Sequence, residues 1–147
     1  MAVTAELFTK GMLALVNKEI DWNSDAIRVA LVTVDYVADY NQDAQDYFDD
    51  ITHEVAAGGG YNAGGELLTV KTQTTAAHVL TCSAATLTWP GSTITARGAI
   101  IYDNQTGVPA TSPLIGFVDF GADVVSTAGD FTITWHVNGI FTITVDS

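Results

Sequence analysis

The sequence is poor in basic residues, and this shortage restricts the partners that the protein can bind. Five lysines and arginines stand against seventeen aspartates and glutamates, which gives a net charge of −12 at pH 7. A surface of this charge repels nucleic acid and anionic lipid. We therefore expect neither nucleic acid nor a membrane as a partner, whereas the charge is compatible with a basic protein surface.

Cysteine and long apolar stretches are also scarce. Cys82 is the single cysteine, so the chain cannot form an internal disulfide. Its setting, HVLTCSAATLTW, is rich in apolar residues and favours a buried structural thiol over a nucleophile. The sequence has no apolar run of the ~18 residues that a transmembrane helix needs. Its start, MAVTAELFTKG, lacks the basic and apolar regions of a signal peptide, so we predict neither a membrane span nor a signal peptide.

The remaining composition indicates one β-rich domain. A length of 147 residues, 48% of them apolar, is typical of a single folded domain. After Gly65 the residues that favour strands dominate, and turn residues recur about every ten positions, as in sandwiches and barrels. We predict a mainly β fold: an antiparallel, jelly-roll-like β-sandwich over residues 26–147, preceded by a helical arm over residues 1–25.

Hydrophobic periodicity places the individual elements. Apolar residues at helical spacing predict a short helix from Thr4 to Ile20, which Gly11 weakens by about 1 kcal/mol. A strand is predicted from Ala26 to Val34. The acidic stretch from Asp35 to Val55 is predicted to be irregular, with one or two helical turns in residues 43–51. The other predicted strands are Glu66–Gln73, His78–Cys82, Thr86–Trp89, Thr93–Tyr102, Leu114–Phe120, Phe131–Val137 and Phe141–Val145.

The last of these strands are predicted to form a hairpin, because FTITWHVNGIFTITV alternates apolar and polar residues on both sides of a turn. A two-residue turn at Asn138-Gly139 would place apolar residues opposite polar ones. A three-residue loop keeps one apolar face continuous, with Val137 opposite Phe141. We therefore predict the longer loop, although Asn-Gly usually forms the shorter turn.

Five of the thirteen glycines lie in EVAAGGGYNAGG, residues 54–65. A phosphate-binding loop would continue into Lys and Ser or Thr at the start of a helix. Here Glu66 and Leu67 follow and open a predicted strand, so the pattern of a nucleotide site fails. We interpret the run as a turn in which the glycines adopt positive φ and Tyr61 fixes the loop by packing. We also expect it to be a hinge between an acidic N-terminal arm and the sandwich.

One acidic stretch, DYNQDAQDYFDD, has part of the spacing of a calcium loop. Asp39, Asn41 and Asp43 alternate as the first ligands of such a loop do, and Asp50 occupies its twelfth position. The sixth position, where the loop turns sharply, is Ala44 instead of Gly. We therefore expect a solvated acidic loop without a metal, and these four residues are the candidate ligands if an ion binds.

No catalytic constellation emerges from the sequence. There is no Gly-x-Ser-x-Gly motif and no cysteine–histidine pattern, and most carboxylates are predicted on loops without an apolar setting that would raise a pKa. DDITHE, residues 49–54, lacks the further His or Cys of a zinc site. Trp22, Trp89 and Trp135 could form a sugar-binding platform, but their settings favour packing. We predict a protein that is not an enzyme and needs no cofactor.

Five segments occur in an order that resembles small structural proteins of tailed bacteriophages. These segments are IDWNSDAIRVALVTVDYVADYN, DDITHEVAAGGGYNAGGELL, TARGAIIYDNQTG, PLIGFVDFG and GDFTITWHVNGIFTI. The resemblance covers Phe8 to Val145 and implies a virion component without an active site, made in the cytoplasm of the host bacterium. It favours a head decoration protein on the outer capsid surface, bound to the lattice of the major capsid protein.

The resemblance leaves two alternatives open. The first is a tail or head-fibre component. The second is a carbohydrate-binding β-sandwich module on the particle surface. The exposed aromatic residues that such a module needs would be Tyr36, Tyr40, Tyr47 or Phe48.

Attachment to a capsid lattice predicts a homo-oligomer, and a trimer is favoured. Interfaces below about 1,200 Å² are typically weak, and linking several of them raises occupancy. Because protomers with a charge of −12 repel one another, the seam between them must be apolar. The candidates for this seam are the sandwich strands and the side of the N-terminal segment that carries Leu7, Met12 and Val16. The acidic residues 39–50 are expected to face solvent or a basic patch on the coat.

Overall fold

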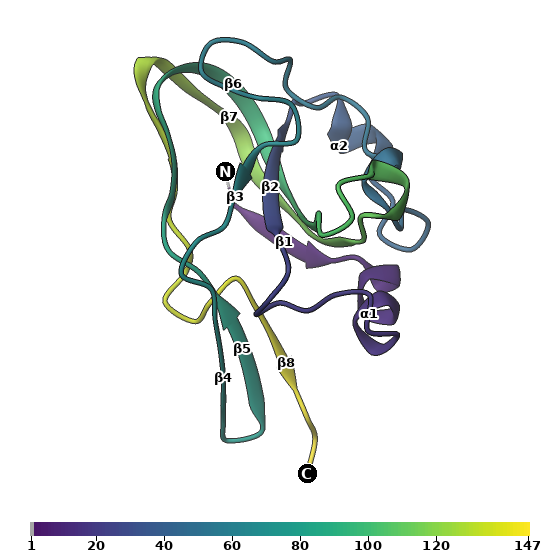
Figure 1. Cartoon of the computed structure of the whole chain (residues 1–147). Coiled ribbons are helices and arrows are strands. Elements are labelled where there is room, and N and C mark those ends of the chain that lie inside the picture. Colours follow the sequence, from purple (N-terminus) through teal and green to yellow (C-terminus); the bar gives the residue numbers. More distant parts are fainter. Residues whose placement is uncertain (1) are drawn as a thin grey trace.

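The protein is built from two antiparallel sheets, as a computed structural model that describes residues 2–147 shows (Figure 1). The larger sheet has five strands in the order β1-β7-β6-β2-β3, and the smaller sheet has three in the order β4-β5-β8. This arrangement confirms the predicted mainly β, antiparallel sandwich.

Within residues 2–147, helices are few and short. The strands are β1 (Thr4–Leu7), β2 (Ile27–Val32), β3 (Glu66–Leu67), β4 (Thr72–Ala76), β5 (Val79–Ser83), β6 (Leu87–Asp103), β7 (Leu114–Ile133) and β8 (Phe141–Thr144). The helices are α1 (Thr9–Val16) and α2 (Tyr36–Asp39), and the 3-10 helices are η1 (Phe48–Asp50) and η2 (Pro109–Thr111).

Two long strands form the centre of the larger sheet. β6 has 17 residues and β7 has 20, and they pair along most of their length. The register shifts near Ser92 and again near Gly98, and the two strands bend in this region (Figure 1). The sequence predicts four separate strands here, with Pro90-Gly91 as a break. That prediction is wrong because an irregularity in the pairing accommodates Pro90 and Gly91 without ending the strand.

β2 lies inside the larger sheet and is buried on both faces. Ile27, Val29 and Leu31 belong to a first core cluster, as predicted for one face of this strand. Ala30 and Val32 belong to a second cluster. Because successive side chains of a strand point to opposite faces, the two clusters lie on opposite sides of the sheet. The predicted strand exceeds the observed one by one residue at its start and two at its end.

The acidic stretch after β2 covers the second cluster. Tyr36 of α2 is fully buried there, and Tyr40, Phe48 and Ile51 pack against the same cluster. The Phe48 ring stacks on Tyr102 of β6 with ring centroids 4.0 Å apart. The aromatic residues of this irregular stretch therefore face the sheet, while most of its carboxylates are exposed.

The N-terminal segment begins with a strand, which corrects the predicted helix from Thr4 to Ile20. β1 pairs antiparallel with β7, so this segment belongs to the larger sheet and is not a separate arm. The helix is limited to α1, and the residue before it, Phe8, is extended and fully buried. Gly11 lets α1 lie close to β7, because a Cβ at this position would come 2.2 Å from the carbonyl oxygen of Leu114.

β8 pairs with β5 of the smaller sheet, so the predicted C-terminal hairpin is wrong. The register places Phe141 opposite Cys82. Residues 131–133 are the end of β7 and pair with β6 instead. Val137, which the hairpin would place opposite Phe141, is 92% exposed and lies in a turn. An alternating pattern identifies a strand and its buried face, but not the strand with which it pairs.

The smaller sheet closes the first core cluster at one end and then projects from the body (Figure 1). All five residues of β4 are exposed, whereas Cys82 of β5 is buried. The predicted strand Glu66–Gln73 is divided into β3 and the start of β4, with Val70 at φ 49° between them. The predicted strand His78–Cys82 agrees with β5 to within one residue at each end.

The glycine run forms tight turns that position Tyr61. The five glycines of the run have φ between 58° and 128°, as predicted. Tyr61 is 1% exposed, and its hydroxyl accepts a hydrogen bond from the Leu31 N–H (3.0 Å) and donates one to Glu54 Oε1 (2.7 Å). The prediction that Tyr61 fixes the loop is therefore confirmed. The strands before and after the run, β2 and β3, pair with each other, so the run joins parts of one sheet, and the prediction of a hinge between an N-terminal arm and the sandwich is wrong.

Candidate interaction surface

The four candidate calcium ligands are engaged with separate partners. Within residues 2–147, no group of three or more acidic, histidine or cysteine side chains is placed to hold a metal ion. The partners are Thr52 and His53 for Asp39, the Asp43 and Ala44 amides for Asn41, Thr9 for Asp43, and the Asp46 amide for Asp50. These contacts hold the acidic stretch in its fold.

The DDITHE stretch is likewise divided between two parts of the molecule. His53 Nε2 lies 3.2 Å from a carboxylate oxygen of Asp39, in the acidic stretch. Glu54 instead accepts hydrogen bonds from the Tyr61 hydroxyl and from the Gly64 amide, in the glycine run. The two side chains therefore do not form a common ligand set.

The tryptophans pack as predicted. Trp22 and Trp89 are 3% and 1% exposed and belong to the first core cluster. Trp135 is half-buried against the same cluster, and its indole N–H donates to the Ala85 carbonyl at 3.1 Å. These rings therefore do not form an exposed sugar-binding platform. Of the other aromatic candidates, Tyr36 is buried and Phe48 is stacked on the sheet.

Cys82 is a buried thiol, as predicted. Its side chain is in the first core cluster and 3% of the residue is exposed. Burial raises the pKa of the thiol to about 11, which keeps it protonated and poorly nucleophilic at neutral pH.

An apolar groove lies on the inner face of the larger sheet, next to the first core cluster. It has a volume of about 440 Å³. Val3 and Ala5 line it at the start of the chain, Val118, Phe120 and Val124 line it from the middle of β7, and residues 131–136, 139 and 140 complete it. Val3 is 63% exposed and Val124 is 43% exposed. Apolar side chains that gather around an open groove in this way are typical of an interaction surface.

The groove lies beside the point where the pairing of β1 with β7 begins. β1 pairs with Gly116–Asp119 of β7. In the part of the chain that the structure describes, no strand pairs with the same edge of β7 beyond Asp119. β7 then bends together with β6 (Figure 1), and the groove lies between the start of β1 and this part of β7.

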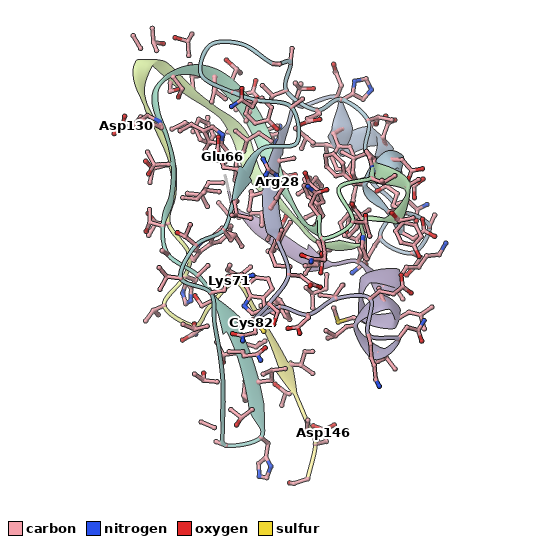
Figure 2. All side chains as sticks on the ribbon, in the orientation of Figure 1. Arg28, Glu66, Lys71, Cys82, Asp130 and Asp146 are labelled. Atoms are coloured by element: carbon pink, nitrogen blue, oxygen red, sulfur yellow. The ribbon has the colours of Figure 1, made fainter. Side chains whose placement is uncertain are left out.

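No carboxylate lines this groove, and His136 is the titratable residue in its wall. The sequence has no Asp or Glu between Glu66 and Asp103, and none from Phe131 to Val145. The smaller sheet lies within these stretches, and Figure 2 shows Lys71 and Cys82 at its base. The carboxylates are thus segregated from the groove and from the smaller sheet in a chain whose net charge is −12.

The three predicted interface residues do not lie on one helical face. Leu7 ends β1 and packs against the first core cluster, Met12 is half-buried in α1, and Val16 is 78% exposed. Helical spacing does not relate Leu7 to the others, because the helix begins after it. The second exposed apolar residue of α1 is Leu13, at 58%, three positions before Val16. It was not among the residues that the sequence singled out.

None of the helices in residues 2–147 is long and apolar enough to cross a membrane. Comparison of the chain with protein-family models, with curated proteins and with solved structures found no match.

Proposed function

We propose that the protein is a non-enzymatic structural component of a tailed-phage virion, a decoration protein that binds the outer surface of the head. The ordered sequence segments support the virion class. The observation that carries the mode of attachment is the apolar groove without carboxylates in an otherwise acidic molecule. The partner is the lattice of the major capsid protein.

The groove provides an apolar contact of limited strength. A leucine or isoleucine side chain of the partner, once buried there, contributes about 1.5–3 kcal/mol. A contact of this size alone corresponds to a dissociation constant above ~1 mM. Occupancy of a shell therefore depends on linking several such contacts, which a homo-oligomer provides. A trimer is the favoured form.

The two faces of the larger sheet differ in a way that fits an outer position. The groove lies on the face of the first core cluster, and the acidic stretch with α2 and η1 covers the opposite face. With the groove directed to the coat, the carboxylates of residues 35–50 face solvent or a basic patch on a neighbouring subunit. An external position also keeps an acidic protein away from the packaged nucleic acid.

The test is to mix the purified protein with coat-protein shells assembled without it, sediment the shells and count the bound copies. We expect saturable binding by an oligomer. Because salt screens the attraction between exposed charges but not apolar contacts, binding should persist as the salt concentration is raised. A protein that stays monomeric and binds no shell at any salt concentration would contradict the proposal. That outcome would favour a tail or head-fibre component, or a glycan-binding module.

A further inference from the structure

Asp103 presents a buried carboxyl oxygen without a partner. Asp103 ends β6, pairs with Ile27 of β2 and is 1% exposed. Its Oδ1 accepts a hydrogen bond from the Gln105 amide at 2.9 Å. Its Oδ2 is buried, and within residues 2–147 no donor reaches it with hydrogen-bond geometry; the nearby Asp21 amide donates to Asp25 instead. A buried carboxylate oxygen in this state is strongly unfavourable, so this group needs an explanation.

Asp25 provides the explanation. Its carboxyl group lies within hydrogen-bonding reach of the Asp103 carboxyl group. Asp25 Oδ2 also accepts a hydrogen bond from the Asp21 amide at 2.9 Å. Asp25 is half-buried and Asp103 is fully buried, and a buried carboxylate beside a second carboxyl group is strongly disfavoured in its ionised form. A proton held between them satisfies the unpartnered oxygen and removes the repulsion.

We propose that Asp103 keeps its proton, hydrogen-bonds through it to Asp25 and so forms a pH-sensitive latch that ties the base of the smaller sheet to the larger sheet. The latch is independent of the proposed role in a virion.

The surroundings of Asp25 connect the two sheets. The Lys71 ammonium donates to the Asp25 carbonyl, just before β4 begins. The Trp22 indole N–H donates to the Thr72 carbonyl of β4 at 3.1 Å. On the other side, the Asn104 amide, just after β6, donates to the Ala26 carbonyl at 2.8 Å. Residues 21–26 thus touch the end of β6 and the start of β4, and Figure 2 shows Lys71 at the base of the smaller sheet.

Burial is the main cause of the protonation of Asp103, and few charged groups lie around it. Asp21 is exposed, and its Oδ1 caps the amides of Asn23 and Ser24. Lys71 is the cation next to this loop, and its ammonium group donates to the backbone carbonyl of Asp25, not to either carboxyl group. Burial, supported by the neighbouring Asp25, raises the pKa of Asp103 to about 7.

The direction of the pH effect follows from this raised pKa. In the unfolded chain an aspartate loses its proton near pH 4. The folded protein keeps the proton until about pH 7. Stability contributed by the pair is therefore fully present below pH 4 and is lost as the pH rises toward 7. Above pH 7 Asp103 loses this proton, and the repulsion between its buried carboxylate and Asp25 loosens residues 21–26 and the base of β4.

The test compares the thermal unfolding of the wild-type protein and Asp103→Asn between pH 4.5 and 9. Asparagine is nearly isosteric and can donate to Asp25 without titrating. We expect the wild-type melting temperature to fall toward pH 7 relative to Asp103→Asn, with the difference levelling off above pH 8. Asp119→Asn is the matched control. Arg97 and the Gly121 amide lower the pKa of Asp119. Asp119→Asn should therefore show the same fall in melting temperature toward pH 7 as the wild type.

A local measurement separates the latch from a general stability effect. Hydrogen exchange of the amides in residues 21–26 and 72–76, corrected for intrinsic rates, should accelerate above pH 7 in the wild type but not in Asp103→Asn. If Asp103→Asn does not fold, Asp25→Asn replaces it. Removing the charge next to Asp103 should also make the melting temperature depend less steeply on pH. An unchanged pH profile in the variant would overturn the proposal. So would calcium raising the wild-type melting temperature at pH 8 but not that of the variant, because a cation would then occupy the place of the proton.

Discussion

Replacing Gly65 by alanine tests the role of the glycine run in the backbone. Gly65 has φ +72°, and a Cβ there would lie 1.8 Å from the Val29 carbonyl oxygen and 2.7 Å from the Ala30 Cα of β2. The left-handed conformation costs an alanine about 1–2 kcal/mol. Forcing β2 aside adds about 1–3 kcal/mol, as in other overpacked sites. We therefore expect a loss of about 2–5 kcal/mol, a large part of the ~5–15 kcal/mol that stabilises a typical domain.

The matched control is Gly91→Ala. Gly91 also has positive φ, +57°, but nothing lies within 4 Å of its added Cβ. This variant should lose only the conformational cost, about 1 kcal/mol. Urea unfolding, followed by the fluorescence of the buried Trp22 and Trp89, measures both. If Gly65→Ala is no less stable than Gly91→Ala, the close contact of the glycine run with β2 is not a constraint on the fold.

Three further predictions concern single side chains. Tyr61→Phe should lose about 1–3 kcal/mol in urea unfolding, because the buried Leu31 amide loses its acceptor; wild-type stability would contradict this. Cys82 should react with a thiol reagent at pH 8 only as fast as the protein opens, because the thiol is buried and its pKa is raised; rapid labelling of the folded protein would contradict that. Val16→Asp should change stability by less than about 0.5 kcal/mol, because Val16 is 78% exposed, and should weaken oligomers seen by sedimentation. If Val16→Asp forms oligomers as stable as those of the wild type, the interface between protomers does not include Val16.

Local sequence patterns predict those elements whose conformation depends mainly on their own residues. The strand β2 is recognisable because every residue of it except Arg28 is apolar, which suits a strand buried on both faces. The acidic stretch after it is recognisable as irregular because it lacks a period. The positive φ of the glycine run follows from glycine itself.

Which strands pair with each other could not be predicted from such local patterns. Phe131 alternates with its neighbours as the first arm of a hairpin would, but its partner is Trp89 of β6. Thr4 begins a segment whose apolar spacing also fits a helix, and the open edge of β7 makes it a strand instead. In both cases a distant part of the chain determines which strand the segment pairs with. A window of ten to fifteen residues contains no information on that distant part.

The groove could not be predicted for a related reason. Its walls come from the start of the chain, from the middle of β7 and from the segment before β8. The apolar character of Trp135 and Ile140 is visible in the sequence. The sequence does not show that these two residues border an open groove. This arrangement depends on the short β1 strand and on the register shifts between β6 and β7, which are properties of the assembled sheet.

Binding of two neighbouring β7 variants to undecorated shells tests the central claim most directly. Val124 lines the groove, whereas Val125 does not line it and is 61% exposed. Val124→Asp places a carboxylate in the groove, and Val125→Asp adds the same charge one residue away, on the opposite face of the strand. The account predicts that Val125→Asp binds shells as the wild type does and that Val124→Asp loses at least tenfold in affinity, with both variants folded. Equal binding by the two variants would show that the groove is not the surface that contacts the coat.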